Sequence, residues 1–360
     1  MKNLDTFRFT ARSDRAFSAD GWFLPAGAAV DALSGNDVIT GESGEVGISI
    51  AGTLDAGDGN DSILAIGYYD SLLNSGTIRT GAGNDRIEGS STENGGIVNS
   101  GFIHTGSGAD ALYGMADDAG FGSLSNTGVI ETGAGGDIVD ANGISNSGLI
   151  STGPGGDLVI GQPFDGFYGI ENSSRIIMDS GNDRIVASGI YKGIWNHGQA
   201  LISTGDGNDT IQAALSEEFG ADQYAIANEG LIRTGRGNDL IRTSLYGTRG
   251  GSPIDNSGSI VTGKGADVVD ALWGGFFGDG LTNLGSGRDR LWGFGTGLFR
   301  GGTGIDTLVF TPGRYAIERL GGGEFLIGGL MRVSGFEAFG QGANDTSFAT
   351  AASNGFVLFA

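Results

Sequence analysis

Twelve short segments related to Gly-x-Gly-x-Asp recur along this 360-residue chain, and each of them ends in an aspartate. Successive aspartates are separated by 17 to 30 residues, with a mean of about 24. A carboxylate that follows closely spaced glycines suits the binding of a hard cation, because glycine allows the backbone to curl until its carbonyl oxygens point inward. The twelve aspartates are Asp37, Asp61, Asp85, Asp110, Asp137, Asp157, Asp183, Asp209, Asp239, Asp267, Asp289 and Asp306.

Calcium is the cation that this donor set suits, since Ca²⁺ takes about six to eight oxygen ligands from carboxylates and backbone carbonyls. One turn supplies too few oxygens, so the neighbouring turn must complete the sphere, which links ion binding to folding. We expect a single row of Ca²⁺ ions along one edge of the molecule. The candidate ligands are the last eleven of those aspartates (Asp61 to Asp306), Asn60, Asn84, Asn208 and Asn238, and the turn glycines Gly57, Gly59, Gly81, Gly83, Gly205, Gly207, Gly235, Gly237, Gly302 and Gly304.

An alternative interpretation is that each aspartate only accepts backbone N–H bonds, as aspartate does in many turns. A column of carboxylates one strand spacing apart would then repel itself by roughly 1–3 kcal/mol for each adjacent pair. Bound cations would remove this cost. About ten Ca²⁺ ions would carry a charge of roughly +20, close in magnitude to the net charge of −22 that the chain carries.

The segment from Thr80 to Glu88, TGAGNDRIE, departs from the nonapeptide G-G-x-G-x-D-x-U-x only at its first residue, and the copy from Gly301 to Val309 is complete. These segments resemble the calcium-binding repeats of the RTX (repeats-in-toxin, haemolysin-type) family, and the resemblance covers roughly residues 31–310. It implies calcium binding and secretion. The chain departs from the family pattern because it has one turn per coil of about 24 residues. The turns with Leu33 and Asp179 in place of glycine are degenerate.

Apolar columns around the aspartates indicate the elements that position them. The second residue after each aspartate is always apolar, and Ile78 begins a column of eight isoleucines, each seven residues before an aspartate. A third apolar column precedes a recurring asparagine, as Leu72 precedes Asn74. Three inward columns separated by turns predict three short parallel strands per coil. We therefore expect an all-β, right-handed parallel β-helix of about 11–12 coils, with N- and C-terminal caps.

Two polar columns fit a structural role in such a stack. The asparagines could form an amide ladder along the axis, as in cross-β assemblies, and the threonines are expected to be structural as well. The asparagines are Asn74, Asn99, Asn126, Asn146, Asn172, Asn196, Asn228 and Asn256, and the threonines are Thr80, Thr105, Thr132, Thr152, Thr204, Thr234 and Thr262.

The ends of the chain lack the repeat. We expect an N-terminal cap over residues 1–30, the β-helix over 31–310 and a small β-rich C-terminal cap over 311–360. The final NGFVLFA is apolar and resembles the tail of type I secretion substrates, although a sealing strand explains it too. The N-terminus has no continuous apolar stretch of the kind that a signal peptide needs. Export, if it occurs, would use a route that does not read the N-terminus.

The amino-acid composition argues against several classes of function. An acidic balance argues against nucleic acid and anionic membranes, and no apolar run approaches the length of a membrane span. We expect an extracellular or cell-surface Ca²⁺-binding protein with a structural or matrix-associated role, folding as it binds Ca²⁺. One alternative is a polysaccharide-active (lyase- or epimerase-like) or glycan-binding β-helix, and another is a self-assembling surface-layer or filament subunit.

No catalytic or organic-cofactor motif is present, so an enzyme is the less favoured class. Insertions all fall between an aspartate and the next asparagine, on one edge of the helix, where binding and catalysis usually occur. The acids that this edge offers to a polysaccharide-active protein are Asp117, Asp118, Asp165, Glu217, Glu218 and Asp222. His104 and His197 are the only histidines of the chain, and His104 is expected to point outward.

Overall fold

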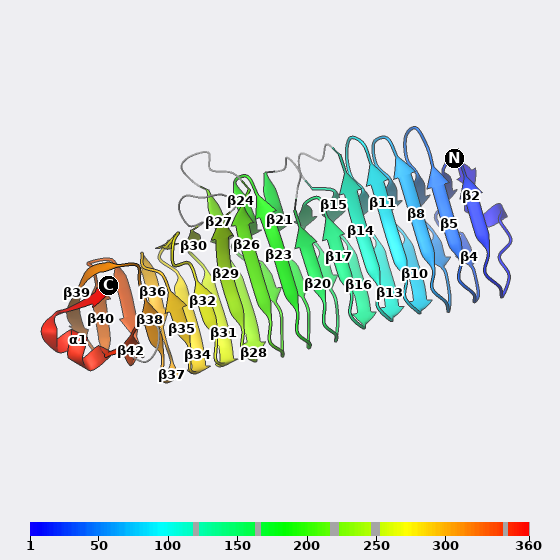
Figure 1. Cartoon of the computed structure of the whole chain (residues 1–360). Helices are drawn as coiled ribbons and strands as arrows, with labels where there is room; N and C mark the ends of the chain where they lie inside the picture. Colours follow the sequence, from blue (N-terminus) through cyan, green and yellow to red (C-terminus); the bar gives the residue numbers. More distant parts are fainter. Residues whose placement is uncertain (118–121, 163–166, 217–222, 246–252, 341–344, 360) are drawn as a thin grey trace.

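The structure is a computed structural model that describes residues 1–117, 122–162, 167–216, 223–245, 253–340 and 345–359. The chain winds into an elongated parallel β-solenoid, with the N-terminus at one end and the helix α1 (Phe348–Asn354) at the other (Figure 1). The expected all-β parallel fold is confirmed. Each regular coil contributes one strand to each of three long sheets, which we name A, B and C.

Sheet A has twelve strands, and each one pairs in parallel with the strand of the next coil. Its strands are β1 (Lys2–Asn3), β3 (Trp22–Leu24), β6 (Ile48–Ile50), β9 (Leu72–Asn74), β12 (Ile97–Asn99), β15 (Leu124–Asn126), β18 (Ile144–Asn146), β21 (Tyr168–Asn172), β24 (Lys192–Asn196), β27 (Tyr224–Asn228), β30 (Ile254–Asn256) and β33 (Phe276–Phe277).

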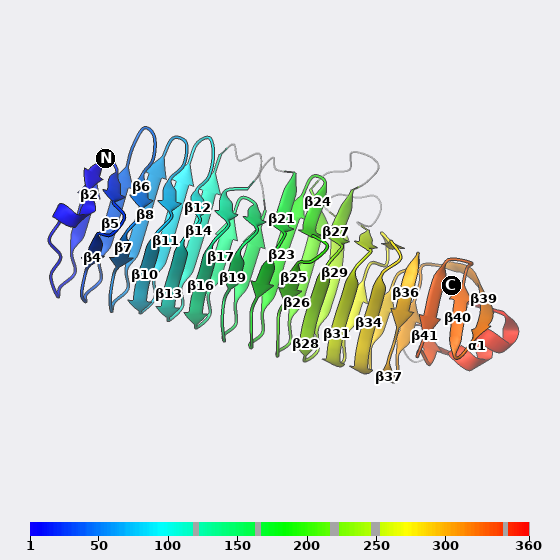
Figure 2. The same ribbon diagram turned by 180° about the vertical axis from the view of Figure 1, so that it is seen from behind.

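Sheet B follows sheet A along each coil and leads into the Gly-Asp turn. Its parallel strands are β4 (Ala29–Asp31), β7 (Thr53–Asp55), β10 (Thr77–Ala82), β13 (Phe102–Ser107), β16 (Val129–Ala134), β19 (Leu149–Ser151), β22 (Arg175–Ile177), β25 (Leu201–Ser203), β28 (Leu231–Arg236), β31 (Ser259–Gly265), β34 (Leu281–Gly287), β36 (Gly297–Arg300) and β37 (Thr303–Gly304). Strands β10, β13 and β16 lie side by side in Figure 2.

Sheet C has fifteen strands and begins directly after each Gly-Asp turn. Its strands are β2 (Arg15–Ser18), β5 (Val38–Glu42), β8 (Ser62–Gly67), β11 (Arg86–Ser91), β14 (Ala111–Ala116), β17 (Ile138–Ala141), β20 (Leu158–Gly161), β23 (Arg184–Gly189), β26 (Thr210–Leu215), β29 (Leu240–Leu245), β32 (Val268–Asp270), β35 (Arg290–Trp292), β38 (Thr307–Val309), β42 (Ala338–Phe339) and β43 (Thr346–Ser347).

The three predicted apolar columns form the core. Ile78 lies opposite Ile103, Ile87 opposite Leu112, and all four side chains are completely buried. Burying a side chain of this size stabilises a fold by about 1.5–3 kcal/mol. Equivalent contacts repeat along the regular coils, and the isoleucine column ends where Ile260 lies opposite Thr282.

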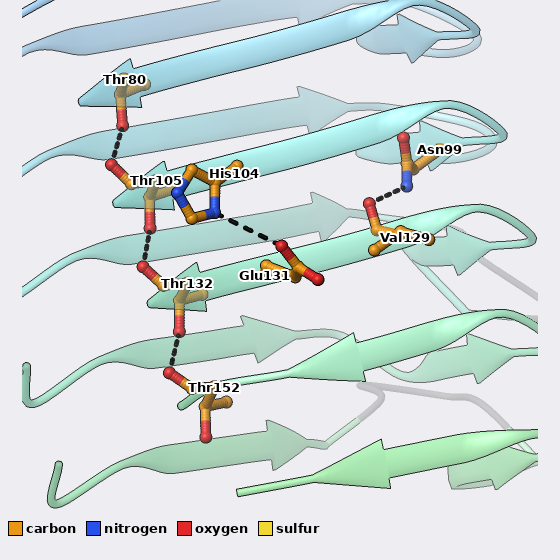
Figure 3. A network of polar contacts seen from close by, with 8 residues as sticks. All are labelled: Thr80, Asn99, His104, Thr105, Val129, Glu131, Thr132 and Thr152. Atoms are coloured by element: carbon orange, nitrogen blue, oxygen red, sulfur yellow. Dashed lines mark hydrogen bonds and ion pairs between the residues drawn. The ribbon is translucent and has the colours of Figure 1, made fainter. Parts of the chain in front are cut away.

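The predicted asparagine ladder is confirmed. From Asn74 to Asn256 the Nδ2 of each asparagine donates to the Oδ1 of the next one at 2.7–2.9 Å. The same Nδ2 atoms also donate to sheet B carbonyls, as Asn99 does to Val129 O at 3.1 Å (Figure 3). These buried amides are therefore structural.

The predicted structural role of the threonine column is also confirmed. The hydroxyl of Thr80 donates to Thr105 O at 3.1 Å, Thr105 to Thr132 O at 2.8 Å, and Thr132 to Thr152 O at 3.0 Å (Figure 3). All of these side chains are buried. The hydroxyl of Thr152 is an exception, because it has no hydrogen-bond partner among the described residues. The threonine hydroxyls also lie close enough to the motif aspartates of their own coils to lower the pKa of those carboxyls.

The chain reverses direction after β38. Strands β39 (Gly313–Gly321), β40 (Glu324–Ile327) and β41 (Met331–Ser334) pair antiparallel in that order, and β41 pairs in parallel with β36. The last strand, β44 (Phe356–Phe359), pairs antiparallel with β39. At the other end the 3₁₀ helix η1 (Leu4–Thr6) follows β1, with Leu4 buried. Residues 2–31 already supply strands to all three sheets.

Candidate metal centre

The Gly-Asp turns join sheet B to sheet C and stack on one another along one edge of the solenoid. Gly81 and Gly83 have φ angles of +100° and +142°, a region that favours glycine. A Cβ on Gly81 would lie 1.8 Å from Gly57 O, and one on Gly83 would lie 1.7 Å from Gly59 O. Glycine is therefore required both by the backbone conformation and by the close stacking of successive turns.

One carboxylate oxygen of every motif aspartate has a defined role. The Oδ1 of Asp85 accepts the backbone N–H of Asp61 at 2.7 Å, and the Oδ1 of Asp110 accepts that of Asp85 at 2.8 Å. The pattern continues without interruption from Asp37 to Asp306 at 2.6–2.9 Å. Asp85 is thus hydrogen-bonded to the motif aspartates one coil away on each side. The completion of one metal site by neighbouring turns stays a prediction.

The other carboxylate oxygen has no such partner. In the described part of the chain, the Oδ2 atoms of all twelve motif aspartates are buried and lack a hydrogen bond. The aspartates themselves are at most 2% exposed. Buried polar atoms are nearly always paired, and an unpaired one costs about 1–3 kcal/mol or more when charged. Accepting backbone N–H groups therefore accounts for only half of each carboxylate.

Burial raises the pKa of every motif aspartate, while the N–H bond from the preceding coil opposes the rise. The pKa reaches about 7 at Asp61, Asp183 and Asp289, and about 6 at Asp157 and Asp239. Neighbouring carboxylates contribute, and the charge of Asp179 raises the pKa of both Asp157 and Asp183. Without a cation the row disfavours its own ionised form.

Both ends of the row carry acids that sequence reasoning missed. The amide of Asp306 donates to Glu337 Oε2 at 2.8 Å, so a glutamate of the C-terminal segment terminates the row. At the other end the amide of Asp14 donates to Asp37, and Asp14 Oδ2 accepts from the N–H and hydroxyl of Thr10. The sequence contains a weak indication of the role of Asp14, because Asp14 lies one repeat length before Asp37 and is followed two residues later by the apolar Ala16.

The asparagines named as candidate ligands lie on the outer side of the turns. Asn60 and Asn84 are exposed, while the aspartate that follows each of them is buried. Asn60 Oδ1 accepts the N–H of Asn84 at 2.7 Å, and Asn208 Oδ1 accepts that of Asn238 at 2.8 Å. They form an outer ladder, and their role as metal ligands stays a prediction.

The residues present fit a Ca²⁺ row of a particular kind. Across the described ranges no group of three or more His, Cys, Asp or Glu side chains gathers at one point. Each turn supplies one buried carboxylate, and the remaining donors would have to be backbone carbonyls. Calcium accepts such carbonyl-rich sites, unlike the metals that prefer nitrogen or sulfur.

The acids named for a polysaccharide-active protein are not part of the aspartate row. Asp118, Asp165, Glu217, Glu218 and Asp222 fall outside the described residues, and Asp117 is exposed.

The two histidines each lie beside a glutamate of an adjacent coil. His104 Nδ1 lies 3.6 Å from Glu131, on the outer face of sheet B as expected (Figure 3), and His197 Nε2 lies 3.1 Å from Glu171. Sequence reasoning did not find these pairs.

The fold and the row define the chain as a parallel β-solenoid with a stacked aspartate edge. The crystal structure of a hyperactive, Ca²⁺-dependent, β-helical antifreeze protein from an Antarctic bacterium is similar, with a TM-score of 0.54 and 18% sequence identity. The match covers 94% of this chain and 93% of that one. No protein-family model and no curated protein matches the sequence. Of the helices described, none has the length and apolar character to cross a membrane.

Proposed function

We propose that the chain is an extracellular β-solenoid that folds as Ca²⁺ ions fill its row of Gly-Asp turns, and that it serves a structural or surface-associated role. The observation that carries the proposal is the unbroken row of twelve buried Oδ2 atoms without partners. A row of divalent cations would pair with these oxygens and cancel the repulsion between coils. The Ca²⁺ dependence of the similar β-helical protein supports the same conclusion.

Secretion through a type I route is supported by the RTX resemblance alone, because the apolar C-terminal residues form β44, which pairs with β39 as a sealing strand would. A chain whose folded state is stabilised by millimolar Ca²⁺ would unfold more readily where Ca²⁺ is scarce and would gain its full stability after export. Because binding and folding are linked, the ions would supply part of the folding free energy.

The test is a comparison of the intact chain in millimolar Ca²⁺ and in EGTA. We expect a gain in β circular dichroism and a higher Tm with Ca²⁺, and ion counting by equilibrium dialysis should return several ions per chain. Mg²⁺ at the same concentration is the matched control, since it demands octahedral geometry and keeps its waters. Equal spectra and equal Tm in Ca²⁺ and EGTA would refute the proposal.

A second candidate function, glycan binding, is favoured by one aromatic group on the outer face of sheet A. Trp195 lies 5.0 Å from Tyr168 between ring centroids, its Nε1–H donates to Glu229 at 3.0 Å, and Lys192 Nζ lies 4.4 Å from its ring centroid. Beside this group the rings of Phe167 and Tyr191 stack at 5.3 Å, and both are 41% exposed.

The fold does not require rings at these positions. Earlier coils place Ser125 and Ser145 at the sheet A position that Trp195 occupies. Aromatic faces with polar groups at their edges suit ligands that have one apolar and one polar side, as sugars do.

Binding of neutral and acidic polysaccharides should therefore weaken in Tyr191→Ala, while Tyr68→Ala, which removes an exposed ring elsewhere, should bind normally. Equal binding by both variants and the parent chain would exclude this surface.

A further inference from the structure

The row of turns is uniform in its buried aspartates but uneven in its exposed charges. The residue between the two glycines of each turn stacks on its counterpart in the next coil, as Ser180 does on Asp206 and Asp206 on Arg236. This position is aspartate at Asp58 and Asp206, but it is basic at Arg236 and Lys264. The electrostatic environment of the buried carboxylates therefore changes along the solenoid.

Within the turns themselves, from the first glycine position to the aspartate, added negative charge is densest in the middle of the row, although Asp31 and Asp55 lie just before the turns of Asp37 and Asp61. The coils of Asp157, Asp183 and Asp209 carry two further carboxylates, those of Asp179 and Asp206. Asp206 lies 3.8 Å from Arg236, which belongs to the following coil. Asp179 has no such ion pair among the described residues.

The turns of the C-terminal coils carry added positive charge instead of added negative charge. The coils that end in Asp239, Asp267 and Asp289 contain Arg236, Lys264 and Arg288 within their turns. Each of these cations stands within three residues of a buried aspartate. A divalent cation entering there meets a positive charge inside the turn itself; the turns of Asp157, Asp183 and Asp209 have none, although Arg184 follows Asp183 directly.

Asp179 is unusual in its conformation as well as its charge. It stands where most other turns have glycine, and its φ is +54°. Leu33 is the only other non-glycine residue with positive φ in the described ranges. Glycine would adopt this conformation without strain, so stability of the fold does not explain a carboxylate here. Asp157 lies one turn before Asp179, and Asp183 lies in the same turn as Asp179. Both have a buried Oδ2 without a hydrogen-bond partner in the described part of the chain.

We propose that the degenerate turn from Asp179 to Asp183, together with Asp157, forms the tightest Ca²⁺ site of the row, and that the coils from Asp239 onward fill last. The inference rests on the proposed function. Calcium affinity rises with the negative charge of a site. This turn adds a nearby carboxylate at the position where most other turns have glycine, without bringing three acidic side chains of the described residues together at one point. The ions would then fill the solenoid from its middle rather than from an end.

The test is calorimetric titration of the intact, Ca²⁺-free chain with CaCl₂. Asp179→Asn removes the charge, and asparagine tolerates positive φ. We expect it to weaken the first binding step roughly tenfold, which is the Coulomb effect in water of one charge about 6 Å from a divalent ion. Asp267→Asn should lower the number of bound ions and leave the first step unchanged. Circular dichroism at saturating Ca²⁺ verifies that each variant folds.

A second pair of variants separates charge from backbone strain. Asp179→Gly and Leu33→Gly both relieve a positive φ, so both should raise the Tm in the absence of Ca²⁺. Only Asp179→Gly should weaken the first binding step.

An unchanged first step in Asp179→Asn, or an equal loss in Asp267→Asn, would overturn the inference while leaving the proposed function intact. A parent chain that binds no Ca²⁺ would instead overturn the proposed function itself.

Discussion

The buried aspartate row predicts that pH acts on stability in opposite directions with and without Ca²⁺. The pKa of Asp61, Asp183 and Asp289 rises from 3.8 to about 7 in the folded chain because of burial and neighbouring carboxylates. The folded state therefore holds more protons than the unfolded state between pH 4 and pH 7. The stability that this contributes is fully present below about pH 4 and is lost as the pH rises through 7.

The size of the expected fall in Tm follows from the pKa shifts. Three pKa units correspond to about 4 kcal/mol for one group. Solvent screening and the coupling between neighbours reduce this to about 2 kcal/mol each, or about 6 kcal/mol for the three. With an unfolding entropy of about 2.1 cal/mol/K per residue, the Tm of a chain of 360 residues should fall by about 8 °C. We expect this fall between pH 4.5 and pH 8 after Ca²⁺ has been removed.

Saturating Ca²⁺ should reverse the trend, because only the ionised carboxylate binds the cation and each binding step releases a proton. The stabilisation by Ca²⁺ should therefore grow from pH 4.5 to pH 8. The assay is thermal unfolding followed by far-ultraviolet circular dichroism, at fixed ionic strength, with dialysed protein and with added CaCl₂. Asp183→Asn is the matched variant, and its Ca²⁺-free Tm should vary less with pH.

Two results would refute the reasoning. A Ca²⁺-free Tm that rises or stays constant from pH 4.5 to 8 would mean that the carboxylates are not desolvated. A Ca²⁺-induced stabilisation that is equal at both pH values would mean that the aspartates do not hold the ion.

Three further substitutions test the architecture by thermal or urea unfolding in Ca²⁺. Gly83→Ala should destabilise the chain by about 3 kcal/mol or more, because its Cβ would lie 1.7 Å from a backbone carbonyl oxygen. Gly27→Ala is the control: Gly27 has a φ of +82° but no atom of the described residues within 4 Å of an added Cβ, so this substitution should cost only about 1 kcal/mol. Asn126→Ala should cost about 2–4 kcal/mol, because it removes two ladder bonds and a bond to Leu149 O; a cost no larger than that of Ser125→Ala would contradict the ladder. Ile130→Ala should cost about 2–5 kcal/mol because it leaves a cavity at a fully buried position, and a cost below about 1 kcal/mol would show that this column does not carry the core.

Much of the fold was predictable because each coil repeats the same environment. An apolar residue such as Ile103 recurs in a fixed place relative to its aspartate, so a column of sequence positions becomes a column in space. The asparagine ladder was predictable for the same reason, since a recurring amide can satisfy its own neighbour.

Features outside the repeat were not predictable. Glu337 ends the aspartate row, but the chain reaches it only after reversing through β39, β40 and β41. Its position depends on tertiary packing rather than on spacing. The His104–Glu131 pair differs, because its members occupy equivalent positions of adjacent coils and the repeat could have indicated it. His197 and Glu171 do not occupy equivalent positions, since Glu171 lies opposite Trp195.

The amide-to-carboxylate bonds between coils all run in one direction, from the N–H of one aspartate to the Oδ1 of the next. Each regular coil is thereby a module that presents the same backbone donor on one side and the same carboxylate acceptor on the other along the aspartate edge, and stability becomes approximately a sum over neighbouring modules. Adding or deleting one whole coil changes the length by about 4.8 Å and leaves every other contact as it was. With eleven such intervals along its twelve strands, sheet A extends about 53 Å along the axis, and this length is set by the number of repeats.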